Sequence, residues 1–142
     1  MIRVFFDASV LFSATYSQTG SSRDLIRGAI RGKIQIVVSR HVLKEVTDNL
    51  TLKAPGALPA FQQLMDLVLP EVVENPTLEE LKRAADYIHP KDAPIVAAAV
   101  KAKVDYLVTW DRKHLVDVPK VAERSGLSVM TPGELMGILV GD

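Results

Sequence analysis

Apolar residues in this chain occur in two patterns: short continuous runs, and longer segments in which they recur every three or four positions. The runs at residues 3–6, 34–38 and 106–108 lack polar alternation, which is typical of strands buried on both faces. Residues 129–130 predict a short edge strand, and residues 72–73 predict another. The chain is therefore expected to contain several short, mostly buried strands.

Helical periodicity occupies the segments between these strands. The start and stop residues of the helices are also recognisable, because N-caps, capping boxes, glycine and proline each favour a particular end. These signals are Gly32 as a stop after the stripe that includes Leu25 and Ile26, Ser39 as an N-cap, Pro70 after a helix over 59–69, the pair Thr77 and Glu80, and the group Thr131, Pro132 and Glu134.

Short strands that alternate with helices predict right-handed βαβ units, and hence an α/β fold with a central, mostly parallel sheet. A length of 142 residues suits one domain over 1–142, with no linker and no internal repeat. Residues 51–59 contain prolines and a glycine and are expected to form an exposed turn or a flexible flap.

Composition narrows the class of protein. The longest apolar stretch, residues 93–100, is too short to cross a bilayer, and Asp7 interrupts the N-terminal run, so we expect neither a membrane span nor secretion. The absence of cysteine agrees with a cytoplasmic location. Because 17 basic residues balance 17 acidic ones, binding of nucleic acid would depend on a local patch, for which Arg112 and Lys113 are the best candidates.

Four acidic residues stand at positions where α/β proteins place functional groups. Asp7 ends the first strand, Asp111 follows the strand at 106–108, Asp92 opens an almost wholly apolar helix, and Glu45 borders the buried stripe of its helix. The carboxyl ends of parallel strands share one edge, so Asp7 and Asp111 should lie near each other. Carboxylates gathered in this way must be paired, protonated or neutralised by a cation. The positions of these residues leave all three outcomes open.

Asp92 is harder to place from the topology. Its helix feeds the strand before Asp111, and we expect such a helix to begin at the opposite edge of the sheet. Asp92 would then reach the other carboxylates only if this segment crosses the sheet steeply, or if Asp92 lies partway along the crossing.

Each acidic residue also has a simpler interpretation. Asp7 and Asp92 could each cap the helix that follows, Glu45 could be a solvated helical side chain, and Asp111 could be a turn residue. The hydroxyl groups of Ser9 and Thr109 could orient carboxylates, or they could satisfy local backbone groups.

Taken together, the segments R-V-F-F-D-A-S-V-L, S-R-H-V-L-K-E-V and P-K-D-A-P-I-V-A-A-A-V-K-A-K-V-D-Y-L-V-T-W-D-R-K-H-L resemble the PIN domain family, especially its VapC-like toxins. The resemblance extends from residue 2 to about residue 135. It implies a three-layer α/β/α Rossmann-like fold in which Asp7, Glu45, Asp92 and Asp111 are catalytic and bind Mg²⁺ or Mn²⁺. It also implies supporting roles for Ser9 and Thr109, a cognate antitoxin partner, and a homodimer. Two positions depart from the family pattern: Ser9 replaces a frequent Asn, and Trp110 replaces small or polar residues.

The preferred hypothesis is a metal-dependent endoribonuclease that hydrolyses RNA phosphodiester bonds, as the toxin of a toxin–antitoxin pair. Oxygen-liganded divalent metals provide the attacking water and the charge neutralisation that this reaction requires. One alternative is a PIN-like RNA-binding or assembly module with weak or no catalysis. Another is a phosphatase of the haloacid-dehalogenase type, but that class needs D-x-D, and Ser9 occupies the second acidic position.

Overall fold

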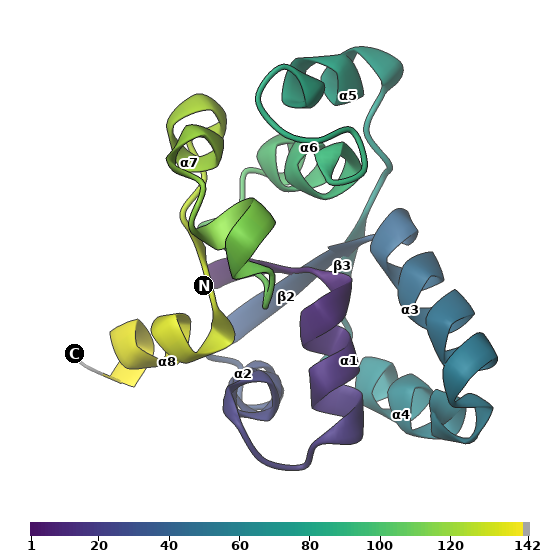
Figure 1. Ribbon diagram of the computed structural model, residues 1–142. Coiled ribbons are helices and arrows are strands. Elements are labelled where there is room, and N and C mark those ends of the chain that lie inside the picture. Colours follow the sequence, from purple (N-terminus) through teal and green to yellow (C-terminus); the bar gives the residue numbers. More distant parts are fainter. Residues whose placement is uncertain (141–142) are drawn as a thin grey trace.

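A computed structural model describes residues 1–140 and shows a five-stranded, all-parallel sheet at the centre of the chain (Figure 1). The strand order is β3-β2-β1-β4-β5. The strands are β1 (Ile2–Phe6), β2 (Ile34–Ser39), β3 (Glu71–Val73), β4 (Tyr106–Val108) and β5 (Val129–Met130). The predicted α/β fold with a parallel sheet is confirmed, and so are the short strands at residues 72–73 and 129–130.

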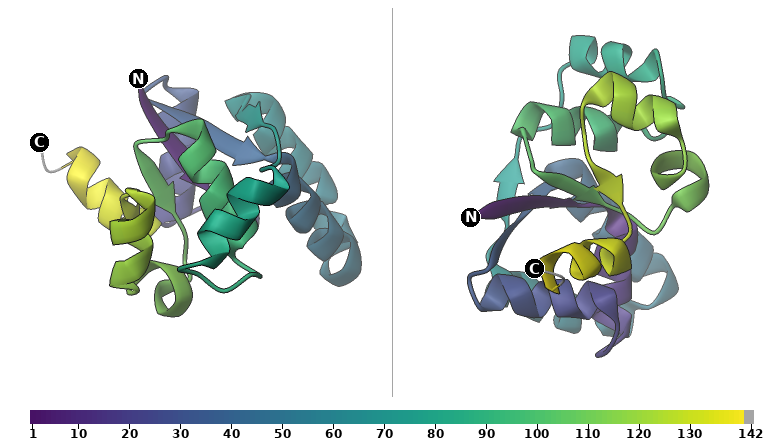
Figure 2. Two further views of the ribbon diagram at one scale, coloured as in Figure 1. Left: turned by 90° about the horizontal axis from the view of Figure 1, so that it is seen from above. Right: turned by 90° about the vertical axis from the view of Figure 1, so that its left-hand side faces the viewer.

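Helices cover both faces of this sheet and complete three layers (Figures 1 and 2). One layer contains α1 (Ala8–Tyr16), α2 (Ser21–Ile30), α3 (Arg40–Lys53), α4 (Leu58–Val68) and α8 (Pro132–Val140). The other contains α5 (Leu78–Ala85), α6 (Ala93–Ala102) and α7 (Pro119–Ser125). Two short helical turns, η1 (Pro55–Ala57) and η2 (Arg112–Val116), complete the described elements.

The strand order explains why there are two helical layers. The chain moves outward from β1 through β2 to β3, then returns to the other side of β1 to form β4 and β5. Right-handed crossovers in opposite directions must use opposite faces of the sheet. The order therefore reverses between β1 and β4, and such a reversal opens a crevice at the carboxyl ends of the two strands.

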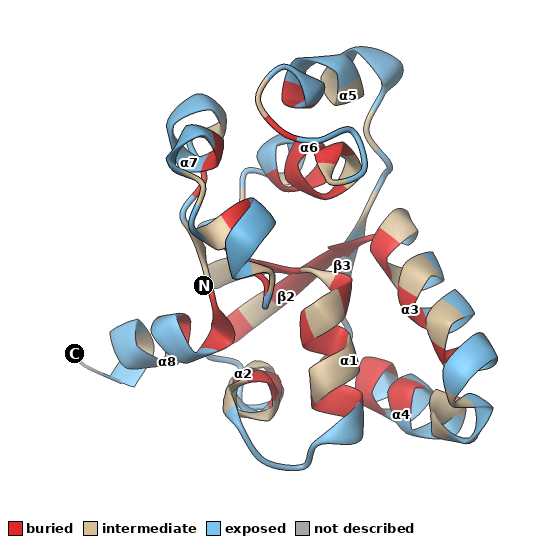
Figure 3. Ribbon diagram, in the orientation of Figure 1, coloured by how far each residue is buried: buried red, intermediate tan, exposed pale blue. Residues whose placement is uncertain are grey.

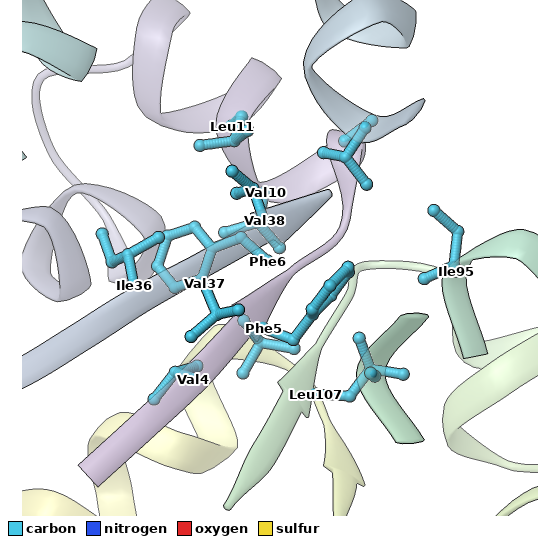
Figure 4. Packing of buried hydrophobic residues seen from close by; sticks show 14 of the residues in the cluster. Val4, Phe5, Phe6, Val10, Leu11, Ile36, Val37, Val38, Ile95 and Leu107 are labelled. Atoms are coloured by element: carbon cyan, nitrogen blue, oxygen red, sulfur yellow. The ribbon is translucent and has the colours of Figure 1, made fainter. Parts of the chain in front are cut away.

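The core lies between the sheet and the two helical layers. Val4, Phe5 and Phe6 of β1 are fully buried, as expected for a central strand covered on both faces. Helix α6 contributes an uninterrupted buried run from Ile95 to Ala99. Figure 3 shows the buried faces of the helices turned toward the sheet, and Figure 4 shows residues of β1, β2 and β4 packed together.

Most of the predicted helix ends are confirmed. The Ser39 hydroxyl accepts a hydrogen bond from the backbone N–H of Val42 at 3.2 Å, and Thr77 and Glu80 form a reciprocal capping box. Thr131 and Glu134 exchange the same pair of bonds at the start of α8, at 3.0 and 3.2 Å. Each cap satisfies backbone donors that a helix start otherwise leaves unpaired.

The prediction that residues 51–59 are exposed is confirmed, but the segment is largely helical and not a turn or flap. Residues 51–53 form the last turn of α3, Pro55–Ala57 form η1, and α4 begins at Leu58. Pro55 and Pro59 occupy the first turns of η1 and α4, where the missing N–H of proline costs no hydrogen bond. Prolines that suggested a loop therefore start helices.

Two further predictions concern surfaces. The apolar stretch at residues 60–69 was a candidate contact surface for the homodimer, with burial in the core as the alternative. Phe61, Leu64, Met65 and Val68 are buried in the core, whereas Leu67 and Leu69 are exposed. Within residues 1–140, none of the helices has the length and apolar character needed to span a membrane.

Candidate active site

The crevice between β1 and β4 holds the ends of both strands. Asp7 directly follows β1, and its backbone N–H donates to the carbonyl of Val108, the last residue of β4, at 3.1 Å. Asp111 lies three residues beyond that strand end. Asp7 and Asp111 therefore lie at one edge of the sheet, as their positions in the sequence predicted.

A pocket of about 290 Å³ opens at this edge and gathers all four predicted acidic residues. They come from four different parts of the fold: the end of β1, the middle of α3, the start of α6 and the segment after β4. The pocket is lined by Asp7, Ala8, Ser9, Phe12, His41, Glu45, Asn49, Lys91, Asp92, Ile95 and Asp111.

Asp7 has the most fixed carboxylate of the four. Its Oδ1 accepts from the backbone N–H of Ala8 at 2.7 Å, and its Oδ2 accepts from the Thr109 hydroxyl at 2.7 Å and the Ser9 hydroxyl at 3.2 Å. Loss of hydration raises the pKa of Asp7, and the negative charge of Asp111 raises it further, although the three hydrogen bonds oppose this. Asp7 thus caps α1 and also presents a carboxylate whose charge lacks full compensation.

Ser9 and Thr109 connect Asp7 to the other strand. The Thr109 hydroxyl also accepts from the backbone N–H of Asp111 at 3.1 Å, and the Ser9 hydroxyl accepts from the backbone N–H of Trp110 at 3.1 Å. Each hydroxyl therefore bridges Asp7 to the segment after β4. These bonds would fix the separation of Asp7 and the Asp111 backbone, which is the geometry expected of supporting residues.

Asp92 occupies the N-cap position of α6 but makes no capping hydrogen bond with its side chain. The simpler interpretation as a cap is therefore wrong, and the carboxylate is available to the pocket. The expectation that α6 begins at the opposite edge was also wrong. A helix that connects two parallel strands runs antiparallel to them, so it begins at the edge where strands end. Asp92 reaches the pocket without any steep crossing.

Glu45 projects from α3 into the same pocket. Partial burial raises its pKa, and the charges of Asp7 and then Asp92 act in the same direction, whereas His41 and Lys91 lower it. Repulsion from Asp7 and Asp92 shows that three of the carboxylates interact electrostatically. A purely solvated role for Glu45 does not account for this environment.

Asp111 is held differently. Its Oδ1 accepts from the backbone N–H of His114 at 3.0 Å, and the Nδ1 of the His114 ring lies 3.2 Å from both carboxylate oxygens. The turn at η2 makes these contacts possible. Asp111 is therefore both a turn residue and a member of the pocket lining.

The four carboxylates are suitable ligands for a divalent cation, but their observed positions do not form a coordination site. Oxygen donors of this kind are the ligands that Mg²⁺ and Mn²⁺ prefer. Burial raises the pKa of Asp7 and of Glu45, and a bound cation would offset the cost of holding these two carboxylates in their charged form. However, no three acidic or histidine side chains within residues 1–140 are close enough together to hold one metal ion. The shared metal ion therefore stays a prediction, and holding it would require local movement of the acidic side chains.

The basic residues predicted to contact nucleic acid have different surroundings. Arg112 pairs with Asp117 and Glu134, each at 3.1 Å, so its charge is already compensated within the protein. Lys113 is exposed on η2. Lys91, which the sequence did not single out as a basic site residue, lines the pocket and lies beside Asp92.

Sequence reasoning missed several other residues of the lining. Phe12 and Asn49 face the pocket from α1 and α3 because they lie one helical turn from Ser9 and Glu45. An adjoining hollow of about 150 Å³ is lined by His89, Lys91, Asp92, Asp111 and His114. Helical spacing from the predicted acids could have found Phe12 and Asn49, whereas the two histidines come together only in the fold.

Comparisons with known proteins agree with this architecture. The PIN domain family model matches residues 3–113. The crystal structure of PAE2754 from Pyrobaculum aerophilum is 19% identical, with a TM-score of 0.65, over 99% of this chain and 91% of that chain. The structure of VapBC2 from Rickettsia felis, bound to a DNA fragment from their promoter, is 14% identical, with a TM-score of 0.66, over 90% of this chain and 97% of that chain. A comparison of the sequence with curated proteins found no match.

The family match spans most of the chain and includes Asp7, Glu45, Asp92 and Asp111. The chain belongs to the PIN domain family. PIN domains are generally nucleases, so the pocket lies in a fold that typically hydrolyses nucleic acid. At identities of 14% and 19%, the two solved structures show the shared fold alone.

Proposed function

We propose that this protein is a metal-dependent endoribonuclease whose active site is the pocket lined by Asp7, Glu45, Asp92 and Asp111. The observation that carries the proposal is the convergence of these four carboxylates, from four separate segments, at the crevice between β1 and β4. Such a concentration of negative charge destabilises the fold unless a cation or a proton compensates it. A nuclease active site accounts for this unfavourable arrangement, because its metal ion requires several carboxylate ligands.

The chemistry of the residues supports Mg²⁺ or Mn²⁺ as the cofactor. When bound, such an ion would activate a water and neutralise charge on the phosphate. Asp7 would hold it with an oxygen that Thr109 and Ser9 orient, and Glu45 and Asp92 would provide further oxygens from the facing helices. Asp111 would join after its carboxylate turns away from the His114 ring, and Lys91 and Lys113 would contact phosphates of the RNA backbone.

Single-turnover cleavage of mixed RNAs in Mg²⁺ or Mn²⁺ tests this proposal. The variant Asp92→Asn should lose more activity than the roughly 10- to 100-fold that follows loss of a partner outside the metal ligands. Asp48→Asn is the matched control, because Asp48 lies on the exposed side of α3 and its ion pair within residues 1–140 is with Lys44. Equal cleavage by Asp92→Asn and Asp48→Asn would remove the assigned active site.

The alternative is a PIN-like RNA-binding or assembly module with weak or no catalysis. The observation that favours it is that no three acidic or histidine side chains within residues 1–140 lie close enough together to hold one metal ion. Binding of RNA without cleavage in either metal, by protein shown to be folded, would select this alternative.

The biological setting proposed is that of a toxin with a cognate antitoxin protein, acting as a homodimer in the cytoplasm. It is supported by family membership and by structural likeness to a chain of a VapBC2 complex. Co-expression with the product of an adjacent small reading frame, followed by size-exclusion chromatography, tests both the partner and the oligomeric state. A monomer that forms no complex with that product would contradict this setting.

A further inference from the structure

Trp110, the only tryptophan in the chain, is an exposed aromatic residue directly before Asp111 of the acidic pocket. It lies between Thr109 and Asp111, and 42% of its surface is exposed. An indole ring left in solvent beside a candidate active site is costly, because burying it would remove a large apolar area from water. The exposure of Trp110 therefore requires an explanation.

The Trp110 ring is fixed although it is exposed. Its Nε1–H lies 2.9 Å from the Ser22 hydroxyl and 3.2 Å from the Ser13 hydroxyl, and these two hydroxyls also hydrogen-bond to each other. Its backbone N–H donates to Ser9. Helices α1 and α2 thus hold the polar edge of the indole, so the ring faces can contact a ligand with little further loss of side-chain entropy.

A second aromatic group continues along α1 from the pocket. Phe12 lines the acidic pocket, and Tyr16, one turn further along the helix, stacks on it with ring centroids 6.4 Å apart and planes within 8°. Tyr16 is 58% exposed. Ser9, Phe12, Ser13 and Tyr16 share one face of α1 by helical spacing, and the buried residues of this helix lie on the other side.

Positive charge is present at both ends of this aromatic face. Arg23 of α2 donates to the carbonyls of Ala14 and Ser17 at the carboxyl end of α1, near Tyr16. Lys91 lines the pocket at the other end. A nucleic acid strand along α1 would thus place backbone phosphates near cations and bases against aromatic rings.

We propose that Trp110, together with the stacked pair of Phe12 and Tyr16, is a base-stacking platform that selects unpaired nucleotides next to the scissile phosphate. The platform rests on the proposed nuclease function and adds the side chains that would contact the bases of the substrate. Bases in a duplex are stacked on each other and offer no free face, whereas every unpaired base does.

Trp110 also supplies its own probe. Its emission, followed during titration with single-stranded RNA in EDTA at low salt, should be quenched as a base stacks on the ring. An abasic oligonucleotide of the same length and an RNA duplex should cause little quenching. The same titration of the Asp92→Asn variant in Mg²⁺ should give the same result in the presence of the cation.

Affinity measured by anisotropy of labelled RNA gives a second, independent readout. Trp110→Ala and Tyr16→Ala should each bind single-stranded RNA about 10-fold more weakly, whereas Trp110→Phe should retain most of the affinity because it keeps an aromatic face. Leu52→Ala is the matched control, because Leu52 is an exposed apolar residue near the far end of α3. Its affinity should equal that of the wild type.

The platform is overturned if Trp110 emission does not change at saturating RNA, or if Trp110→Ala binds as tightly as Leu52→Ala. If the wild type cleaves RNA and Asp92→Asn does not, these results would remove the platform and leave the nuclease function intact. The opposite result is also possible: RNA quenches Trp110 and binds in a way that depends on the aromatic residues, but no cleavage occurs. That result would support the platform and refute the nuclease function.

Discussion

The substitution Asp7→Asn should stabilise the protein in the absence of metal, although it removes a proposed catalytic group. The carboxylate of Asp7 loses hydration and lies near the charge of Asp111, and both effects raise its pKa. Asparagine has nearly the same shape and can keep hydrogen bonds to the backbone of Ala8 and to the hydroxyls of Ser9 and Thr109. The change therefore removes an unfavourable charge without opening a cavity.

The expected size of the effect follows from typical values for single substitutions. Relief of an unpaired charge should be worth about 1 kcal/mol, which for a chain of this length corresponds to a rise in melting temperature of about 3 °C. A divalent ion present at about 100 times its dissociation constant should instead stabilise the wild type by about 2.7 kcal/mol, or roughly 8 °C. Asp7→Asn should lose most of this second shift because a metal ligand is gone.

Thermal melts in EDTA and in Mg²⁺ or Mn²⁺, with Asp48→Asn as the control, measure both effects. The order of stability should reverse: the variant melts higher in EDTA, and the wild type melts higher in metal. A lower melting temperature for Asp7→Asn in EDTA would show that the hydrogen bonds to Asp7 outweigh its lost hydration. An equal response of both proteins to metal would refute the assignment of Asp7 as a ligand.

Three further predictions concern the pH dependence of Asp7→Asn, the Thr109 hydroxyl and the buried core. In EDTA, the difference in melting temperature between Asp7→Asn and the wild type should shrink as pH falls from 7. Folding raises the pKa of the Asp7 carboxyl, so this group stabilises the wild type when protonated and loses that contribution as pH rises through the folded-state pKa. Melts at several pH values check this, and a constant difference would contradict it. Thr109→Val should weaken metal affinity by about 10- to 100-fold in calorimetric titration, since Thr109 orients Asp7; unchanged affinity would deny that role. Leu107→Ala, in the fully buried centre of β4, should cost about 2 to 5 kcal/mol in urea unfolding, and a loss below 1 kcal/mol would mean that this part of the core repacks.

Much of the fold could be predicted because buried strands are visible in the sequence as short apolar runs. Residues 4–6 and 107–108 are wholly apolar because helices cover both faces of the central strands. The capping box at Thr77 and Glu80 depends on residues only three positions apart, so local sequence is sufficient. Local sequence was not sufficient at residues 51–59, because proline is favourable both in turns and at helix starts.

The candidate site was predicted in its membership but not in its present geometry. Asp7 and Asp111 follow from the rule that strand ends share an edge, and Asp92 follows once the direction of α6 is treated correctly. The contact of Asp111 with His114 depends on the π-helical turn at η2, which periodicity does not reveal. The pairing of Arg112 with Glu134 joins residues 22 positions apart and also required the fold.

We propose that the carboxylates at the crevice between β1 and β4 bind one common divalent ion. A crystal of the protein soaked in Mn²⁺ would locate that ion by its anomalous scattering. We predict a Mn²⁺ peak within ligand distance of Asp7 and of at least two among Glu45, Asp92 and Asp111, with Asp111 turned away from His114. A fully soaked crystal with no peak in this pocket, or with Mn²⁺ bound elsewhere while Asp111 still contacts His114, would contradict the account.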